Sequence, residues 1–130
     1  MADKDRFTFN KAERISGKIR INHLFTSGEA FLVYPFRVVY MKKTGSDTDR
    51  ITSVLISIPK KRLKRAVDRN RIKRLAREAY RLNKRILVDS DDKMPLDIAF
   101  IYVADKLVSY QLVEKSITKA LHILNSREMK

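Results

Sequence analysis

The sequence predicts a small α+β domain in which helices pack on one sheet, in the order helix, strand, strand, helix, strand, helix. Three observations support this fold class. Apolar residues recur at helical spacing in three segments, β-branched and aromatic residues form three strand-like runs, and the 130 residues contain no internal repeat or linker. We therefore expect a single domain over residues 1–130, a two-layer sandwich with a mixed or antiparallel sheet, whose ends (1–10 and 126–130) are flexible.

The first helix is predicted over about residues 17–27. Ser16 is a suitable N-cap, and Gly28 follows as a stop. An apolar side is expected from Ile19, Leu24 and Phe25. The segment therefore has a start signal, an apolar side and an end signal, as expected for a short helix packed on a larger core.

The first two strands are predicted over residues 36–42 and 51–59, which are rich in β-branched and aromatic residues. Pro35 interrupts the first apolar run, so residues 31–34 are interpreted as a lead-in and not as a strand. Residues 44–50 have the composition of a turn. Because only this short segment separates the two strands, we expect an antiparallel hairpin.

A long helix is predicted over about residues 66–87, after a basic loop at 60–65. Its cations, Lys84 among them, are expected on the side opposite the core. Residues 96–104 form a nearly continuous apolar run, typical of a central strand buried on both faces. Residues 109–126 have the pattern of a last amphipathic helix. The buried stripe of the long helix is expected to consist of Ile72, Leu75, Ala76, Ala79, Leu82 and Ile86.

The positive charge of the chain is concentrated in one segment. The sequence has 29 Lys and Arg against 15 Asp and Glu, a net charge of +14, and residues 60–85 alone hold 13 cations and two acids. Like charges four residues apart on a helix cost about 0.2–0.5 kcal/mol per pair. This cost indicates a polyanionic partner, for which nucleic acid is the best candidate. Six cations form the unbroken i, i+4 series Arg65, Arg69, Lys73, Arg77, Arg81 and Arg85.

Several kinds of chemistry have no support in the sequence. The chain has no cysteine, which excludes disulfides and thiol catalysis and favours the cytoplasm. Its three glycines form no phosphate-binding loop, and His23 and His122 belong to no metal-ligand or catalytic pattern. No apolar run reaches membrane-spanning length, and the first residues do not resemble a secretory signal. We therefore expect a binding protein with no catalytic or metal-ligating residue of its own.

The run RNRIKRLAREAYR resembles the signature of the protein component of bacterial ribonuclease P. That family's pattern is approximately R-N-R-x-K-R-x-x-R-[EQ]-x-[FY]. Residues 14–28 are similar to the family's first helix, and the resemblance covers about residues 9–125. The chain departs from the family at Pro59, where Ser is frequent, and at Ile21, where an aromatic residue is common. The chain matches the signature at Arg69, Asn70, Arg71, Lys73, Arg74, Arg77, Glu78 and Tyr80.

The resemblance implies the accessory subunit of an endoribonuclease that removes the 5′ leader of precursor tRNA. Catalysis would reside in an RNA subunit that binds Mg²⁺, which this chain would not ligate. The implied partners are that catalytic RNA and the precursor tRNA, with no membrane and no obligate protein partner. A left-handed crossover around the signature helix is also implied. The residues expected to bind RNA are Lys60, Lys61, Arg62, Lys64, Arg65, Arg69, Asn70, Arg71, Lys73, Arg74, Arg77 and Arg81.

A second surface is implied for the single-stranded leader, in a cleft between the first helix and the sheet. Side chains alternate along a strand, so Arg37 and Val39 share one face. We expect these two residues and Ser57 to form the floor of the cleft, with Ile21 and Phe25 on its rim. A floor with a cation and small polar groups, beside an aromatic rim, suits single-stranded RNA that is bound through its phosphate backbone and by stacking of its bases.

Two other functions compete with this interpretation. A general RNA-binding or ribosome-associated module would bind any structured RNA without a preference for a leader. A basic protein that coats DNA or membranes would bind duplex DNA or anionic vesicles at the same salt concentration. The defined core and the apolar strand at 96–104 argue against a simple membrane-surface helix.

Overall fold

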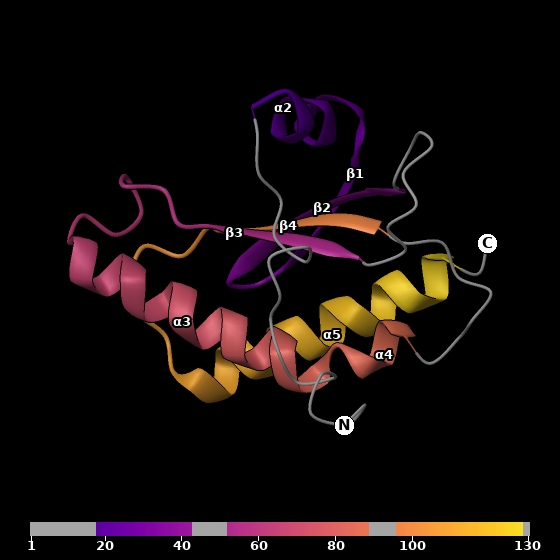
Figure 1. The fold of residues 1–130 in the computed structure, drawn as a ribbon. Coiled ribbons are helices and arrows are strands. Elements are labelled where there is room, and N and C mark those ends of the chain that lie inside the picture. Colours follow the sequence, from indigo (N-terminus) through magenta and orange to yellow (C-terminus); the bar gives the residue numbers. More distant parts are fainter. Residues whose placement is uncertain (1–17, 43–51, 89–95, 129–130) are drawn as a thin grey trace, which may run out of the picture.

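The computed structural model describes residues 18–42, 52–88 and 96–128, and the labels used here are those of Figure 1. The predicted cap at Ser16, the turn at 44–50 and the first ten residues lie outside these ranges. In chain order the elements are α2 (Lys18–Ser27), β1 (Glu29–Val33), β2 (Phe36–Lys42), β3 (Ser53–Ser57), α3 (Ala66–Asn83), α4 (Arg85–Val88), β4 (Leu96–Tyr102) and α5 (Tyr110–Glu128).

The strands form one mixed sheet with helices on both faces. Figure 1 shows α2 on one face and α3, α4 and α5 on the other. The predicted α+β class and mixed sheet are confirmed, and α2 adds a small layer of its own. We call the two sides the α2 face and the α3 face. The fold therefore separates the first helix from the signature helix by the thickness of the sheet.

The order of the strands differs from the prediction. The sheet order is β1-β2-β4-β3, in which β4 pairs antiparallel with β2 and parallel with β3. The expected hairpin between residues 36–42 and 51–59 is therefore wrong, because β4 lies between these two strands. The reason is burial: every residue of β4 except Ile101 is buried, so the most apolar strand occupies the centre. The handedness of the β3-to-β4 crossover stays a prediction.

The lead-in before Pro35 is itself a strand. β1 pairs antiparallel with β2, from Glu29 opposite Tyr40 to Val33 opposite Phe36. The Tyr34–Pro35 peptide bond is cis and lies in the turn between the two strands. Pro35 therefore does not interrupt a ladder, since a turn residue needs no donor for strand pairing.

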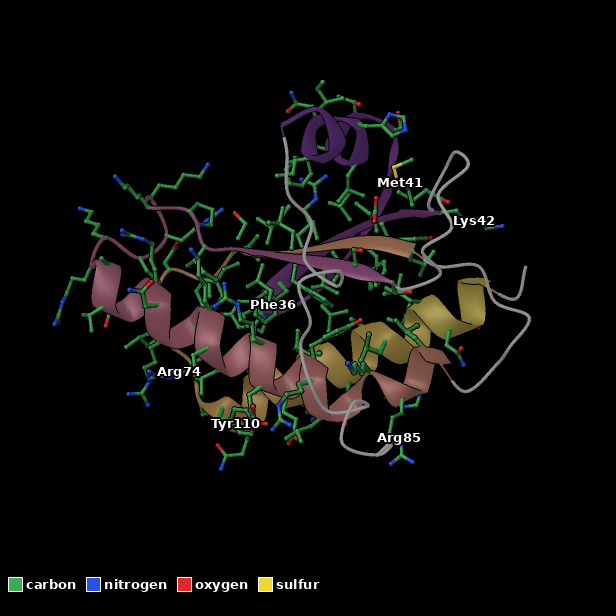
Figure 2. The ribbon with its side chains drawn as sticks, in the orientation of Figure 1. Phe36, Met41, Lys42, Arg74, Arg85 and Tyr110 are labelled. Atoms are coloured by element: carbon green, nitrogen blue, oxygen red, sulfur yellow. The ribbon has the colours of Figure 1, made fainter. Side chains whose placement is uncertain are left out.

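The core consists of two clusters, one on each face of the sheet. On the α3 face, the Phe36 ring meets Phe100 and Tyr102 edge-on at centroid distances of 6.0 and 5.7 Å. On the α2 face, a small cluster centres on the buried Leu24, Val39 and Ala99. Figure 2 shows the alternation along β2, with Phe36 toward the long helices and Met41 toward α2. The main cluster fixes the position of α3, and the small one fixes that of α2.

The buried stripe of α3 is confirmed at Ile72, Ala76 and Ala79, but the prediction fails near the end of the helix. Leu82 is 40% exposed, whereas Tyr80 is only 2% exposed. The helix ends at Asn83, and the chain then bends into α4, which changes the side that faces the core. Lys84, expected to point outward, is consequently buried.

Gly28 is required by the close approach of α2 to the sheet. Its backbone N–H donates to the carbonyl of Leu24 at 2.8 Å, which ends the helix as predicted. A β-carbon at this position would lie 2.5 Å from the Leu24 oxygen and 2.9 Å from the Tyr40 oxygen. Because both neighbours are backbone atoms, a larger residue here would displace α2 from the sheet.

Candidate nucleic-acid interface

The outward side of α3 carries a row of cations together with one asparagine. Asn70, Arg71, Arg74 and Arg77 are exposed, and Lys73 is half-buried. None of these five side chains makes a hydrogen bond or ion pair within the part of the chain that the structure describes. Figure 2 shows Arg74 pointing away from the sheet into solvent. These side chains are therefore available to an anion.

Arg81, at the end of the same helix, is already paired. Its Nε and Nη2 donate to the two carboxylate oxygens of Glu78 at 3.0 and 2.7 Å. The hydrogen bond from Arg81 lowers the pKa of Glu78, and the same bond raises the pKa of Arg81. The fork of Arg81 is thus occupied by a carboxylate, and its charge is locally neutralised.

Two more arginines from the predicted set are used inside the protein, at the basic loop (residues 60–65). Arg69 Nη1 donates to the carbonyls of Leu63 and Lys64 at 2.9 and 2.8 Å. Arg62 Nη1 lies 2.8 Å from Asp105 Oδ1, in the segment after β4. The loop is therefore held from α3 on one side and from the β4–α5 connection on the other.

The basic loop presents its lysines to solvent. Lys60, Lys61 and Lys64 are exposed and make no ion pair with any residue that the structure describes. Arg65 is also largely exposed, with a carboxylate oxygen of Asp68 at 4.0 Å. Figure 1 shows the loop at the end of the sheet where β3 stops and α3 begins. It therefore joins the cations of α3 to the end of the sheet.

The structure places the five predicted cleft residues on α2 or on the α2 face of the sheet. Arg37 and Ser57 both lie opposite Ile101, one on each side of β4, and form one row across the sheet. Ile21 packs against the small cluster, and Phe25 is 43% exposed on α2. Along this row, the exposed guanidinium of Arg37 and the half-buried hydroxyl of Ser57 lie on either side of β4, where one extended ligand could reach both.

Val39 has a different role from the other floor residues. Its side chain is 5% exposed and packs in the small cluster with Leu24 and Ala99. It is therefore covered by α2 and supports the helix from below. The two predicted floor residues that stay accessible are Arg37 and Ser57, with the half-buried Ile101 between them.

Leu32 on β1 extends the row and was missed in the sequence. It lies directly opposite Arg37 and is 66% exposed. Residues opposite each other in an antiparallel pair share a face, so Leu32 lies beside Arg37 at the sheet edge. The apolar residues before Pro35 do indicate a strand, but the proline directly after them favours a lead-in when only the sequence is considered.

The described residues offer no metal centre, and none of their helices is long and apolar enough to cross a membrane. They do form a shallow hollow of about 560 Å³ between α5 and the end of α3, far from the basic loop. It contains no residue of either predicted set. Its lining consists of Asn83, Gln111, Glu114, Lys115, Thr118, Lys119 and His122.

Comparisons with known proteins agree with both the sequence pattern and the fold. The family model described as ribonuclease P matches residues 9–125. The ribonuclease P protein component of Porphyromonas gingivalis is 44% identical over 124 residues, covering 93% of this chain and 89% of the relative. The corresponding protein of Clostridioides difficile is 34% identical over 110 residues, covering 84% of this chain and 89% of the relative.

Solved structures share the fold at lower sequence identity. The RNase P protein of Staphylococcus aureus superposes with a TM-score of 0.71 at 23% identity, covering 92% of this chain and all of that one. The protein from Thermotoga maritima gives a TM-score of 0.69 at 22% identity, covering 85% of this chain and 96% of that one. The strand order described above is therefore that of a known fold.

Proposed function

Because the chain belongs to the ribonuclease P protein family, and is thus the protein component of a tRNA 5′-processing endoribonuclease, we propose that it binds two RNAs through two surfaces. α3 and the basic loop bind the catalytic RNA subunit. The α2 face guides the 5′ leader of precursor tRNA. The observation that carries the proposal is the row of outward-facing cations on α3, which have no partner among the residues that the structure describes.

The α3 surface suits a folded RNA backbone. Arginine forks bind phosphate oxygens through two parallel hydrogen bonds, and lysine supplies a point charge. Asn70 adds both a donor and an acceptor, which matches a 2′-hydroxyl group. Engaging six phosphates would make log affinity fall with log salt concentration with a slope of about −4 to −5. Association with the RNA subunit should therefore be strongly salt-dependent.

The chain assists catalysis without supplying the reacting groups. We assign the Mg²⁺ ions to the RNA subunit, as the family implies. The cations of α3 and of the basic loop lower the electrostatic repulsion between the catalytic RNA and the precursor tRNA. This neutralisation would let the RNA subunit work at a lower Mg²⁺ concentration.

The α2 face suits a single strand. Arg37 offers a charge for a leader phosphate, and Ser57 offers a hydroxyl on the same row. The exposed part of Phe25 supplies a stacking surface at the side of α2, and base stacking tolerates different sequences. This arrangement would distinguish precursor tRNA, which has a leader, from mature tRNA, which has none.

Cleavage of precursor tRNA by a bacterial ribonuclease P RNA at low Mg²⁺, with and without this chain, tests both surfaces. We expect stimulation that largely disappears when the leader is trimmed to one nucleotide. Stimulation that does not depend on leader length would support the α3 surface and reject the leader surface. Salt-sensitive binding without any stimulation would instead indicate a general RNA-binding module.

Arg37→Ala is expected to reduce the preference for precursor over mature tRNA by about 1–2 kcal/mol, a factor of about 5–30, because one charged contact to the leader is lost. Affinity of the chain for the RNA subunit should not change. Lys42→Ala is the matched control, since Lys42 is exposed on the same strand but at its other end (Figure 2). An equal loss for both variants would mean that net charge, and not the α2 face, sets the preference.

A further inference from the structure

We propose that Arg69 is a positioning residue, which holds the basic loop in shape for RNA and does not itself bind a phosphate. The proposal rests on the RNA-binding role proposed for α3 and the loop. The first and second arginines of the signature, Arg69 and Arg71, would then have different roles, because Arg71 is exposed to solvent.

The hydrogen bonds of Arg69 support this role. One nitrogen, Nη1, is shared between the carbonyls of Leu63 and Lys64, at 2.9 and 2.8 Å. These carbonyls belong to the last residues of the loop before the N-cap of α3. The Leu63 side chain is inserted into the main core, which anchors this end of the loop. The two hydrogen bonds from Arg69 therefore tie α3 to a part of the loop that is already fixed on its other side.

The loop needs such a restraint because of its composition. Three exposed lysines within five residues repel one another, and no acid lies between them in the sequence. The carbonyl of Pro59 accepts from the N–H groups of Arg62 and Leu63 at 3.0 and 3.3 Å, which curls the start of the loop. Arg69 fixes its end. A loop ordered before binding loses less conformational entropy when RNA binds.

Arg71 provides the contrast within the same helix. It is exposed and has no side-chain partner among the described residues, whereas Arg69 is half-buried and directed toward the loop. The two residues carry the same charge and lie two positions apart, so bulk electrostatics does not distinguish them. Substituting each in turn therefore separates positioning from direct binding.

A double-mutant cycle tests the proposal on affinity for ribonuclease P RNA. Arg69→Gln is made in the native chain and in a chain that already carries K60A, K61A and K64A. We expect about a tenfold loss in the native chain, the size expected for hydrogen bonds from a charged donor, and almost no further loss in the triple variant. The same factor in both backgrounds would show that Arg69 binds RNA directly and would overturn the proposal. Arg71→Gln, the matched control, should cost the same in both.

Hydrogen exchange of the free protein gives a readout that needs no RNA. In Arg69→Gln, the amides of Arg62 and Leu63 should exchange faster, while those of β4 and α5 keep their native rates. In Arg71→Gln, the loop should exchange as in the native chain. Native exchange in the loop of Arg69→Gln would overturn the proposal. Failure of the native chain to bind ribonuclease P RNA would instead reject the proposed function, and the exchange result would still stand.

Arg69→Lys covers the case in which the glutamine variant does not fold. Lysine keeps the charge but carries a compact ammonium on a flexible stem, in place of the rigid planar group that holds Nη1 against the two carbonyls. We expect a folded protein with a thermal midpoint near that of the native chain, faster loop exchange and weaker RNA binding. Native affinity together with native loop exchange in Arg69→Lys would overturn the proposal, since a simple charge would then be sufficient.

Discussion

Replacing Arg74 and Arg77 together by alanine is expected to weaken binding of ribonuclease P RNA by about 2–4 kcal/mol, a factor of roughly 30 to 1,000. Both side chains are exposed on the same side of α3 and have no partner among the residues that the structure describes. Each fork is therefore free to bind phosphate without first breaking an internal bond. Titration of labelled RNA at several salt concentrations measures both the loss and its salt dependence.

The salt dependence distinguishes lost phosphate contacts from a damaged fold. Removing two phosphate contacts should reduce the steepness of the log–log salt plot by about 1.5. The matched control is Lys115→Ala with Lys119→Ala, which removes the same charge from exposed positions on α5. This pair should change affinity less than twofold, since screening weakens the effect of distant surface charges. Equal losses for the two pairs would show that net charge is sufficient and that α3 has no special role.

The α3 surface was predictable because it depends on local features. Helical spacing places residues three and four apart on one side, so the apolar positions Ile72, Ala76 and Ala79 also indicate where the cations point. The ion pair between Glu78 and Arg81 joins two residues at this same spacing. The predicted buried stripe fails from Tyr80 onward, where the helix nears its end and tertiary contacts decide which side is buried.

The order of the strands was not predictable from local features. The segments at 36–42 and 51–59 are adjacent in sequence, and a hairpin is the usual result of such proximity. The outcome depends on β4, which follows some forty residues after β3 and offers seven residues that are nearly all buried. A strand buried on both faces is most stable with a neighbour on each side, so it separates β2 from β3.

The internal contacts of Arg62 and Arg69 were also not predictable from the sequence. Arg62 pairs with Asp105 across forty-three positions, and Arg69 bonds to backbone carbonyls whose place depends on the path of the loop. In a basic segment every arginine looks equally available. Only the fold shows which of them are already used within the protein. The face shared by Arg37 and Val39, by contrast, follows from the two-residue period of one strand, whereas the position of Ser57 on that face depends on pairing through β4.

Phe100→Ala is expected to lower the free energy of unfolding by about 3–5 kcal/mol, since it removes a fully buried ring from the centre of the main cluster. The free energy of unfolding of small domains is about 5–15 kcal/mol in total, so this single substitution would remove a large part of the stability. The Phe100 ring contacts Phe36 edge-on, and the cavity would lie between the sheet and the long helices. Urea unfolding followed by circular dichroism measures the loss.

Ile101→Ala, one position further along β4, is the informative comparison. Ile101 is half-buried on the α2 face, between Arg37 and Ser57, so its truncation should cost only about 1–2 kcal/mol of stability. Its effect should appear in leader preference, whereas Phe100→Ala should keep native leader preference at temperatures where it is folded. Successive residues of one strand would then serve stability and recognition separately. If Phe100→Ala altered leader preference while fully folded, the two faces would be coupled, and the α2 face would depend on the packing of α3.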